Sequence, residues 1–115
     1  MCRVLVVEDE RSLRLLLRNA LESSGLGVIE AADGHHAIEA CAGRPIDVLV
    51  CDLFLPDMMA QDVIPIALMS NPNLKVLVMS GESEPAIRSY GISDRCWVVT
   101  KPFKLSEFVR IVEGS

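Results

Sequence analysis

Polar residues with reactive side chains follow four apolar stretches of the sequence. Residues 4–7 lead into Glu8, Asp9 and Glu10, residues 46–51 into Asp52, and residues 96–99 into Thr100 and Lys101, while residues 74–80 end in Ser80. Carboxylate, hydroxyl and ammonium groups bind phosphoryl groups and the divalent cations that accompany them. These residues are therefore the first candidates for a functional site.

The acidic residues of this set are suited to a metal ion. Mg²⁺ (or Mn²⁺) prefers oxygen ligands and keeps several waters, so acids from two neighbouring strand ends can share one ion. A bound cation lets carboxylates lie together that would otherwise repel one another and take up protons. With Lys101 and Ser80 nearby, Asp52 is a candidate nucleophile that forms an acyl phosphate.

Each of these residues also has an ordinary structural explanation. Acids at residues 8–10 would stabilise a helix dipole, and an aspartate after a strand often forms a turn or caps a helix. Ser80 before Gly81 and Lys101 before Pro102 are both common in surface loops. The functional interpretation is favoured because all of these residues are expected at one edge of one sheet.

Apolar stretches that alternate with amphipathic segments indicate the fold. Five stretches are typical of parallel strands buried on both faces: residues 4–7, 26–31, 46–51, 74–80 and 96–99. Five segments have helical periodicity: residues 11–23, 34–43, 61–70, 83–91 and 104–114. This order predicts an α/β, flavodoxin-like, doubly wound (βα)5 fold with a five-stranded parallel sheet in the order 2-1-3-4-5. Such sheets bind ligands at the carboxyl ends of their strands.

Three of the predicted helices carry specific expectations. The apolar side chains of residues 11–23 are expected on one stripe: Leu13, Leu16, Leu17, Ala20 and Leu21. Pro65 is tolerated only near the first turn of its helix. His35 and His36 are expected to be solvated first-turn residues, not metal ligands.

Length and composition limit the class of protein. With 115 residues, 50% of them hydrophobic, the chain is expected to form one domain, residues 1–115, without an output domain. A formal net charge of −5 argues against nucleic acid or an anionic membrane as a partner. Without a leader or membrane-spanning stretch, a cytoplasmic location is expected. The four scattered cysteines are expected to be reduced structural thiols: Cys2, Cys41, Cys51 and Cys96.

Five motifs, in this order and spacing, resemble those of the receiver domain of two-component response regulators: VLVVEDE, EAADGHHAIEA, DVLVCDLFLPDM, KVLVMSGES and VVTKPF. The resemblance covers essentially the whole chain. It implies a phosphorylation-dependent signalling switch whose only chemistry is its own phosphorylation and slow dephosphorylation, not a turnover enzyme. The implied partners are a sensor histidine kinase or histidine phosphotransfer domain, an output domain or target protein, and a second copy in a phosphorylation-dependent homodimer.

The resemblance also implies roles for individual residues. Asp52 would be the phosphoacceptor, and Ser80 and Lys101 would contact the phosphoryl oxygens. The Lys101–Pro102 peptide bond would be cis, a feature of tight turns. The implied groups around Mg²⁺ (or Mn²⁺) are Glu8 through a water, Asp9, Asp52 and the backbone carbonyl of Phe54.

The sequence departs from the family pattern at several positions. The family carries a switch aromatic three residues before the lysine, where this chain has Val98. Trp97 is expected on the opposite face of its strand, so it would not substitute for that aromatic. Glu8 stands where aspartate is commoner, and Ala60 where glycine is common. Two further residues are expected to flank the site and affect the access of water: Phe54 and Glu82.

Two other functions compete with the switch. A receiver-like interaction module that works without phosphorylation is motivated by Val98 and Glu8. A small hydrolytic phosphatase with Asp52 as nucleophile is disfavoured, because Phe54 stands where a second acid would protonate the leaving group. The partner surface stays open, since four residues are either exposed contacts or ordinary core: Ile87, Tyr90, Trp97 and Phe108.

Overall fold

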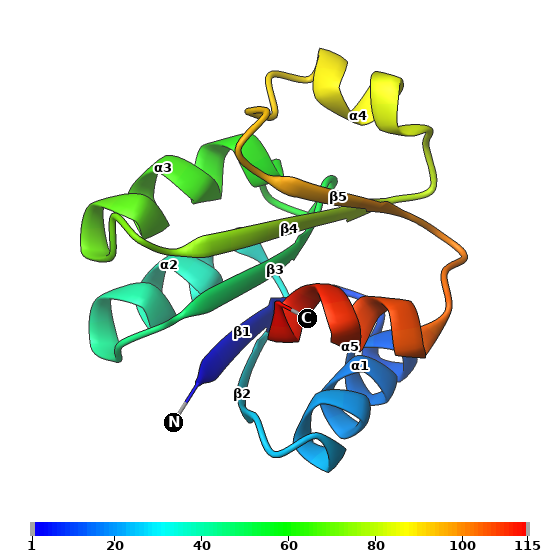
Figure 1. The fold of residues 1–115 in the computed structure, drawn as a ribbon. Helices are drawn as coiled ribbons and strands as arrows, with labels where there is room; N and C mark the ends of the chain where they lie inside the picture. The colour runs from blue at the N-terminus through cyan, green and yellow to red at the C-terminus, as the bar shows by residue number, and fades with distance from the viewer. Residues whose placement is uncertain (1, 115) are drawn as a thin grey trace.

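The computed structural model describes residues 2–114, which form a five-stranded parallel sheet and five helices (Figure 1). The strands are β1 (Arg3–Val7), β2 (Gly27–Ala31), β3 (Val48–Asp52), β4 (Lys75–Ser80) and β5 (Trp97–Thr100). The helices are α1 (Arg11–Ser23), α2 (Gly34–Gly43), α3 (Ala60–Ser70), α4 (Glu84–Ser89) and α5 (Leu105–Glu113). The sheet order β2-β1-β3-β4-β5 confirms the predicted flavodoxin-like doubly wound fold.

The two faces of the sheet bury separate apolar clusters. On one face, Leu17 of α1 and Phe108 of α5 pack with strand residues such as Val6, and Figure 1 shows these two helices together on that side. On the other face, residues of α2, α3 and α4, such as Ile87, pack with strand residues such as Leu49. Because β1, β3 and β4 are covered on both faces, their sequences are nearly continuous apolar runs.

The strand order reverses beside β1, at the carboxyl ends of β1 and β3. From β1 the chain crosses outward to β2 and then returns past β1 to β3. Val7, the last residue of β1, pairs with Cys51 of β3, so the next residues along the two chains, Glu8 and Asp52, lie side by side at this end of the sheet. This reversal is the switch point at which doubly wound folds bind ligands.

Two local predictions were wrong. Helix α3 begins at Ala60, so Pro65 lies in its second turn and removes the hydrogen bond that the Gln61 carbonyl would otherwise accept. The buried stripe of α1 is narrower than predicted, because Leu17 and Leu21 are fully buried but Leu16 is 49% exposed. Leu16 therefore lies outside the buried stripe, which periodicity alone does not reveal.

The four candidates for exposed contacts divide into two pairs. Ile87 and Phe108 are fully buried, so for these two the alternative of ordinary core residues holds. Tyr90 is 37% exposed and Trp97 is 52% exposed. All four residues are large and apolar or aromatic, so residue type alone does not separate the buried pair from the exposed pair.

The cysteines behave as predicted. All four are free thiols, with Cys41, Cys51 and Cys96 buried and Cys2 partly buried. Burial raises the pKa of the Cys51 thiol, which keeps it protonated and unreactive.

Gly34 begins α2 at a point where the loop after β3 packs against the helix. A methyl group at this position would lie 2.3 Å from Cγ and 2.4 Å from Sδ of Met58. Replacing Gly34 with alanine is expected to lower the free energy of unfolding by about 1–3 kcal/mol, because the packed Met58 side chain must shift. Urea unfolding measures this change.

Gly43, at the other end of the same helix, is the matched control. A methyl group there meets no atom within 4 Å. Gly43→Ala is therefore expected to raise the free energy of unfolding by up to about 1 kcal/mol through reduced freedom of the unfolded chain. Equal losses at the two glycines would contradict the packing explanation.

Candidate functional site

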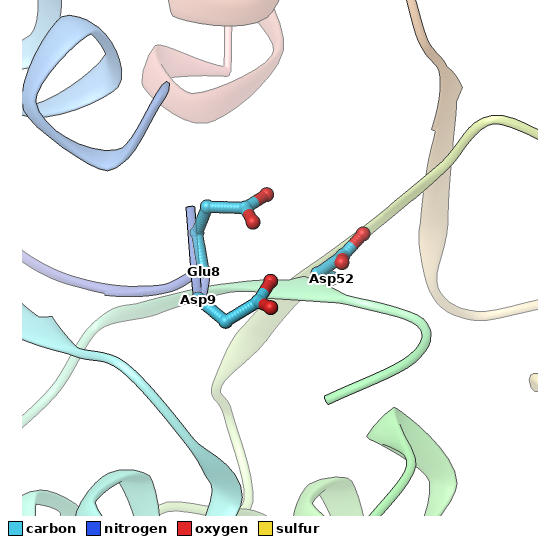
Figure 2. A group of neighbouring side chains, drawn as sticks. All are labelled: Glu8, Asp9 and Asp52. Carbon is cyan, nitrogen blue, oxygen red and sulfur yellow. The ribbon is translucent and has the colours of Figure 1, made fainter. Parts of the chain in front are cut away.

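Two strand ends bring three carboxylates together at the switch point. Glu8 and Asp9 follow β1, and Asp52 ends β3. One oxygen of each lies within 4.8 Å of the others, and Figure 2 shows the Glu8 and Asp9 side chains extending toward Asp52. Glu8 is only 1% exposed, whereas Asp9 is exposed and Asp52 is half-buried. The structure thus brings together the acids that the sequence singles out, and we call them the acidic cluster.

Lys101 places a positive charge against the acidic cluster. Its Nζ lies 2.8 Å from Glu8 Oε1 and 3.1 Å from Asp52 Oδ1. The residue follows β5 and is fixed by its own N–H, which donates to the Ser80 carbonyl at 2.7 Å. The peptide bond between Lys101 and Pro102 is cis, as predicted.

The acidic cluster carries more negative charge than Lys101 neutralises. Burial raises the pKa values of Glu8 and Asp52, although Lys101 acts to lower both. For Lys101 itself, burial acts to lower the pKa, but the hydrogen bonds and charges of Glu8 and Asp52 outweigh it and raise the pKa. One ammonium therefore does not balance three carboxylates.

The donor set fits a hard divalent cation. All three candidate groups offer carboxylate oxygen, the ligand that Mg²⁺ and Mn²⁺ prefer. Both oxygens of Glu8 already accept hydrogen bonds, Oε1 from Lys101 at 2.8 Å and Oε2 from the Glu10 N–H at 3.0 Å. This pairing favours Asp9 and Asp52 over Glu8 as direct ligands.

Ser80 ends β4, next to the strand that carries Asp52. Its side chain is buried, and its Oγ accepts a hydrogen bond from the Glu82 N–H at 3.2 Å. Because the Oγ accepts this bond, its own hydrogen is available for donation to another acceptor. Ser80 pairs in register with Thr100, the residue before Lys101, so the ends of β4 and β5 lie together beside the acidic cluster.

An aromatic contact joins the loop after β3 to the end of α4. The ring of Phe54 meets the ring of Tyr90 edge to face, with centroids 5.2 Å apart. The Tyr90 hydroxyl lies 3.5 Å from Glu82 Oε1, a long contact, and Glu82 Oε2 is buried without a partner among residues 2–114. Thr100 Oγ1 donates to the Glu82 carbonyl at 3.0 Å. Tyr90 thus contacts both Phe54 and Glu82 and links them, a connection that the sequence did not indicate.

Val98 and Trp97 face opposite sides of the sheet, as predicted. Val98 is partly buried and packs against the cluster formed with α2, α3 and α4. Trp97 pairs in register with Leu77, which belongs to the opposite cluster. Its ring centroid lies 5.0 Å from Lys75 Nζ. Trp97 therefore does not occupy the place of the missing switch aromatic.

Asp57 ties the loop after β3 to the start of α2. Its carboxylate accepts hydrogen bonds from the N–H of Gly34 at 2.8 Å and of His35 at 2.9 Å. The side chains of His35 and His36 are exposed, as predicted. The loop that Asp57 fastens also carries Phe54, so the carboxylate helps to hold the segment beside the acidic cluster.

Replacing Asp57 with asparagine is expected to make the domain less stable in a pH-dependent way. The hydrogen bond from the Gly34 N–H lowers the pKa of Asp57, so this group stabilises the fold above the ordinary aspartate pKa of about 3.9. That contribution is lost as the pH falls through the lowered value. Thermal melts should show a gap between wild type and Asp57→Asn that is full at pH 7 and shrinks below about pH 4. A constant gap, or an equal one for the exposed control Asp94→Asn, would contradict the assignment.

Arg14 and Glu30 lie beside the acidic cluster, and sequence reasoning missed them. The periodicity of α1 puts Arg14 opposite the apolar stripe, but its side chain is only 15% exposed and its Nε lies 2.9 Å from Glu30 Oε1 of β2. Their pairing spans two elements, and no spacing along the chain signals it.

The doubly wound fold and the acid–lysine site at its switch point define a receiver-type α/β domain. The sequence profile of the family described as "Response regulator receiver domain" matches residues 4–113. The chain belongs to the response regulator receiver domain family.

Individual relatives agree with this family. The "Probable transcriptional regulatory protein TcrX" of Mycobacterium tuberculosis is 37% identical over 107 residues, covering 92% of this chain and 46% of the relative. The "Response regulator receiver protein CpdR" of Brucella abortus is 30% identical over 114 residues, covering 98% of this chain and 95% of the relative. A response regulator receiver protein from Sinorhizobium medicae superposes with a TM-score of 0.89 at 26% identity, covering 98% of this chain and 92% of that one. The chain therefore spans less than half of the first relative and nearly all of the second.

Family membership brings several general properties. Receiver domains are generally phosphoacceptor switches of two-component systems, not turnover enzymes. They generally bind Mg²⁺ at an acidic pocket, and they partner with sensor kinases and output domains. Within residues 2–114, no helix is long and apolar enough to cross a lipid bilayer.

Proposed function

We propose that the chain is a phosphorylation-dependent signalling switch, which accepts a phosphoryl group on Asp52 in a Mg²⁺-dependent reaction and then changes its binding to a partner. The position of Asp52 carries this proposal. Its half-buried carboxylate lies 3.1 Å from Lys101 Nζ and within 4.8 Å of oxygens of Glu8 and Asp9. A half-buried carboxylate with a raised pKa and a cationic partner, at the switch point of a doubly wound sheet, is typical of a reactive group.

Phosphorylation of Asp52 requires a nucleophilic oxygen beside positive charge. An Asp52 oxygen attacks the phosphorus and forms a P–O bond, while the bond from phosphorus to the donor breaks and its electrons leave with the donor. A bound Mg²⁺ supplies positive charge to the phosphoryl oxygens. Lys101 keeps its proton because its pKa is raised, so its ammonium donates to a phosphoryl oxygen throughout the transfer. The Ser80 hydroxyl, held by the Glu82 N–H, donates to another.

The proposed partners follow from this chemistry and from the family. The phosphoryl donor is a sensor histidine kinase or a histidine phosphotransfer domain in the cytoplasm. The recipient of the signal is an output domain, a target protein or a second copy of the chain. The coverage of the relatives supports two architectures. The receiver domain is either joined to a further segment of chain, as in TcrX, which is about twice the matched length, or makes up almost the whole protein, as in CpdR.

Phosphorylation by a small donor tests the proposal directly. The purified chain, incubated with acetyl phosphate and Mg²⁺, is expected to gain one phosphoryl group by intact-mass spectrometry, and chelation of the metal should prevent the gain. Borohydride reduction followed by peptide mapping should locate the acyl phosphate at Asp52. Failure to form any adduct would overturn the proposal.

A module that binds partners without phosphorylation is the second candidate. The observation that favours it is Val98, which packs in the core where the family has its switch aromatic. This candidate predicts that partner binding is the same with and without acetyl phosphate. A change in binding on phosphorylation would exclude it.

A further inference from the structure

We infer that Arg14 is a positioning residue for the acidic cluster, because it fixes the peptide unit that joins Glu8 to Asp9. The inference rests on the proposed function, in that the acids it positions are those proposed to hold Mg²⁺. The Arg14 side chain bonds to Glu30 and to the Glu8 carbonyl, so it acts on the acids through their backbone.

The contact between Arg14 and the acidic cluster is made to the backbone. Arg14 Nη1 donates to the Glu8 carbonyl oxygen at 2.8 Å. That carbonyl belongs to the peptide unit between Glu8 and Asp9, so its direction determines how Asp9 leaves the end of β1. The Glu8 N–H, on the preceding peptide unit, donates to the Ala31 carbonyl at 3.1 Å. The backbone of Glu8 is therefore held from β2 on one side and from α1 on the other.

Glu30 holds the Arg14 guanidinium in place. Arg14 Nε donates to Glu30 Oε1 at 2.9 Å, and Arg18 pairs with Glu30 Oε2. Burial acts to raise the pKa of Glu30, but its bonds to Arg18 and Arg14 outweigh this and lower it. Glu30 therefore stays ionised and balances the charge of Arg14. A fixed, neutralised guanidinium orients the acids without strongly repelling a divalent cation.

The geometric demand of the site explains why such an anchor matters. Mg²⁺ requires nearly octahedral coordination, and groups that orient its ligands affect binding as strongly as many direct contacts. Asp9 is exposed, so the packing of its side chain contributes little to its direction. The bond from Arg14 to the Glu8 carbonyl supplies that restraint from the backbone.

Arg18 offers a matched control for a substitution of Arg14. Both arginines pair with Glu30 from the same helix, but only Arg14 contacts the Glu8 carbonyl. Arg14→Ala and Arg18→Ala therefore both remove an ion pair with Glu30, and thermal melts without metal monitor the loss of stability in each. Mg²⁺ affinity should separate the two variants.

Calorimetric titration of Mg²⁺ into the metal-free proteins tests the inference. Arg14→Ala is expected to bind Mg²⁺ about 10-fold more weakly than wild type, the lower end of losses seen when an orienting partner is removed. Arg18→Ala should bind nearly as wild type does, and Arg14→Gln, which keeps a donor without the charge, should recover part of the affinity. Equal affinities for Arg14→Ala and Arg18→Ala would overturn the positioning role.

Two further measurements separate this inference from the proposed function. If Asp9→Ala weakens Mg²⁺ binding while Arg14→Ala does not, only the positioning role fails. If wild type does not bind Mg²⁺, the proposed function fails, and the ¹⁵N NMR spectrum of the metal-free protein still tests Arg14. The Asp9 amide resonance is expected to shift or broaden in Arg14→Ala but not in Arg18→Ala, and an unchanged Asp9 resonance would overturn the inference.

Discussion

Replacing Asp52 with asparagine is expected to abolish the Mg²⁺-dependent phosphoryl adduct completely and, without metal, to make the domain more stable. The amide lacks the nucleophilic oxygen that attacks phosphorus, so no acyl phosphate can form at this position. Burial raises the pKa of Asp52, and the charge of Asp9 raises it further. A carboxyl group with a raised pKa costs stability once it ionises, so the cost develops as the pH rises through the raised value and is present at pH 7.

Mg²⁺ should reverse the order of stability between the two proteins. Wild type gains free energy from a ligand that binds the folded state, whereas Asp52→Asn has lost one of the acids of the cluster and gains less. Urea unfolding gives the free energy of unfolding of each protein with and without Mg²⁺, and intact-mass spectrometry detects the phosphoryl adduct. The exposed Asp94→Asn is the charge-matched control and should behave as wild type in each experiment. An adduct on Asp52→Asn, or a wild type that is more stable without metal, would contradict this account.

Replacing Phe108 with alanine is expected to lower the free energy of unfolding by about 3–5 kcal/mol. The side chain is fully buried and stacks on Phe103, with ring centroids 5.6 Å apart. Its removal leaves a cavity between α5 and the sheet that neighbouring side chains fill only in part. Since small domains are stable by only about 5–15 kcal/mol, much of this variant should be unfolded in mild denaturant. Urea unfolding followed by circular dichroism measures the loss.

Leu16→Ala is the control for this core substitution. Leu16 is 49% exposed although the periodicity of α1 places it among the buried residues. Its truncation is expected to change the free energy of unfolding by no more than about 0.5 kcal/mol. A loss at Leu16 as large as that at Phe108 would show that both helices are packed differently from the structure described.

The fold was predictable because strands that are buried on both faces of a sheet have a recognisable sequence pattern. Parallel strands covered by helices read as apolar runs, and each acidic or hydroxyl residue that interrupts such a run marks a strand end. Once the five strands share one direction, all their carboxyl ends fall on one edge, so proximity of Asp9, Asp52 and Lys101 follows from topology.

Contacts between helices and loops were not predictable in the same way. The periodicity of α1 puts Arg14 opposite its apolar stripe, but the guanidinium reaches back to the Glu8 carbonyl at the end of β1. Tyr90 meets Phe54 across 36 residues of chain, through an aromatic contact that no periodicity encodes. Phe108 and Tyr90 are both aromatic, but Phe108 is fully buried whereas Tyr90 is 37% exposed, a difference that residue type does not indicate.

The single tryptophan gives the protein an optical probe of one region only. Trp97 begins β5, and the ammonium of Lys75 lies over its ring. Lys75 begins β4 and donates to the Ile111 carbonyl of α5. Both residues lie at the amino ends of their strands, whereas Asp52 lies at the carboxyl end of β3. Metal binding at the acidic cluster should therefore be silent in Trp97 emission. A change in that emission on phosphorylation would report a rearrangement transmitted along β5 to the side of α5. Native fluorescence therefore measures whether the structural change reaches the far end of β5, and not whether the acidic cluster holds a metal ion.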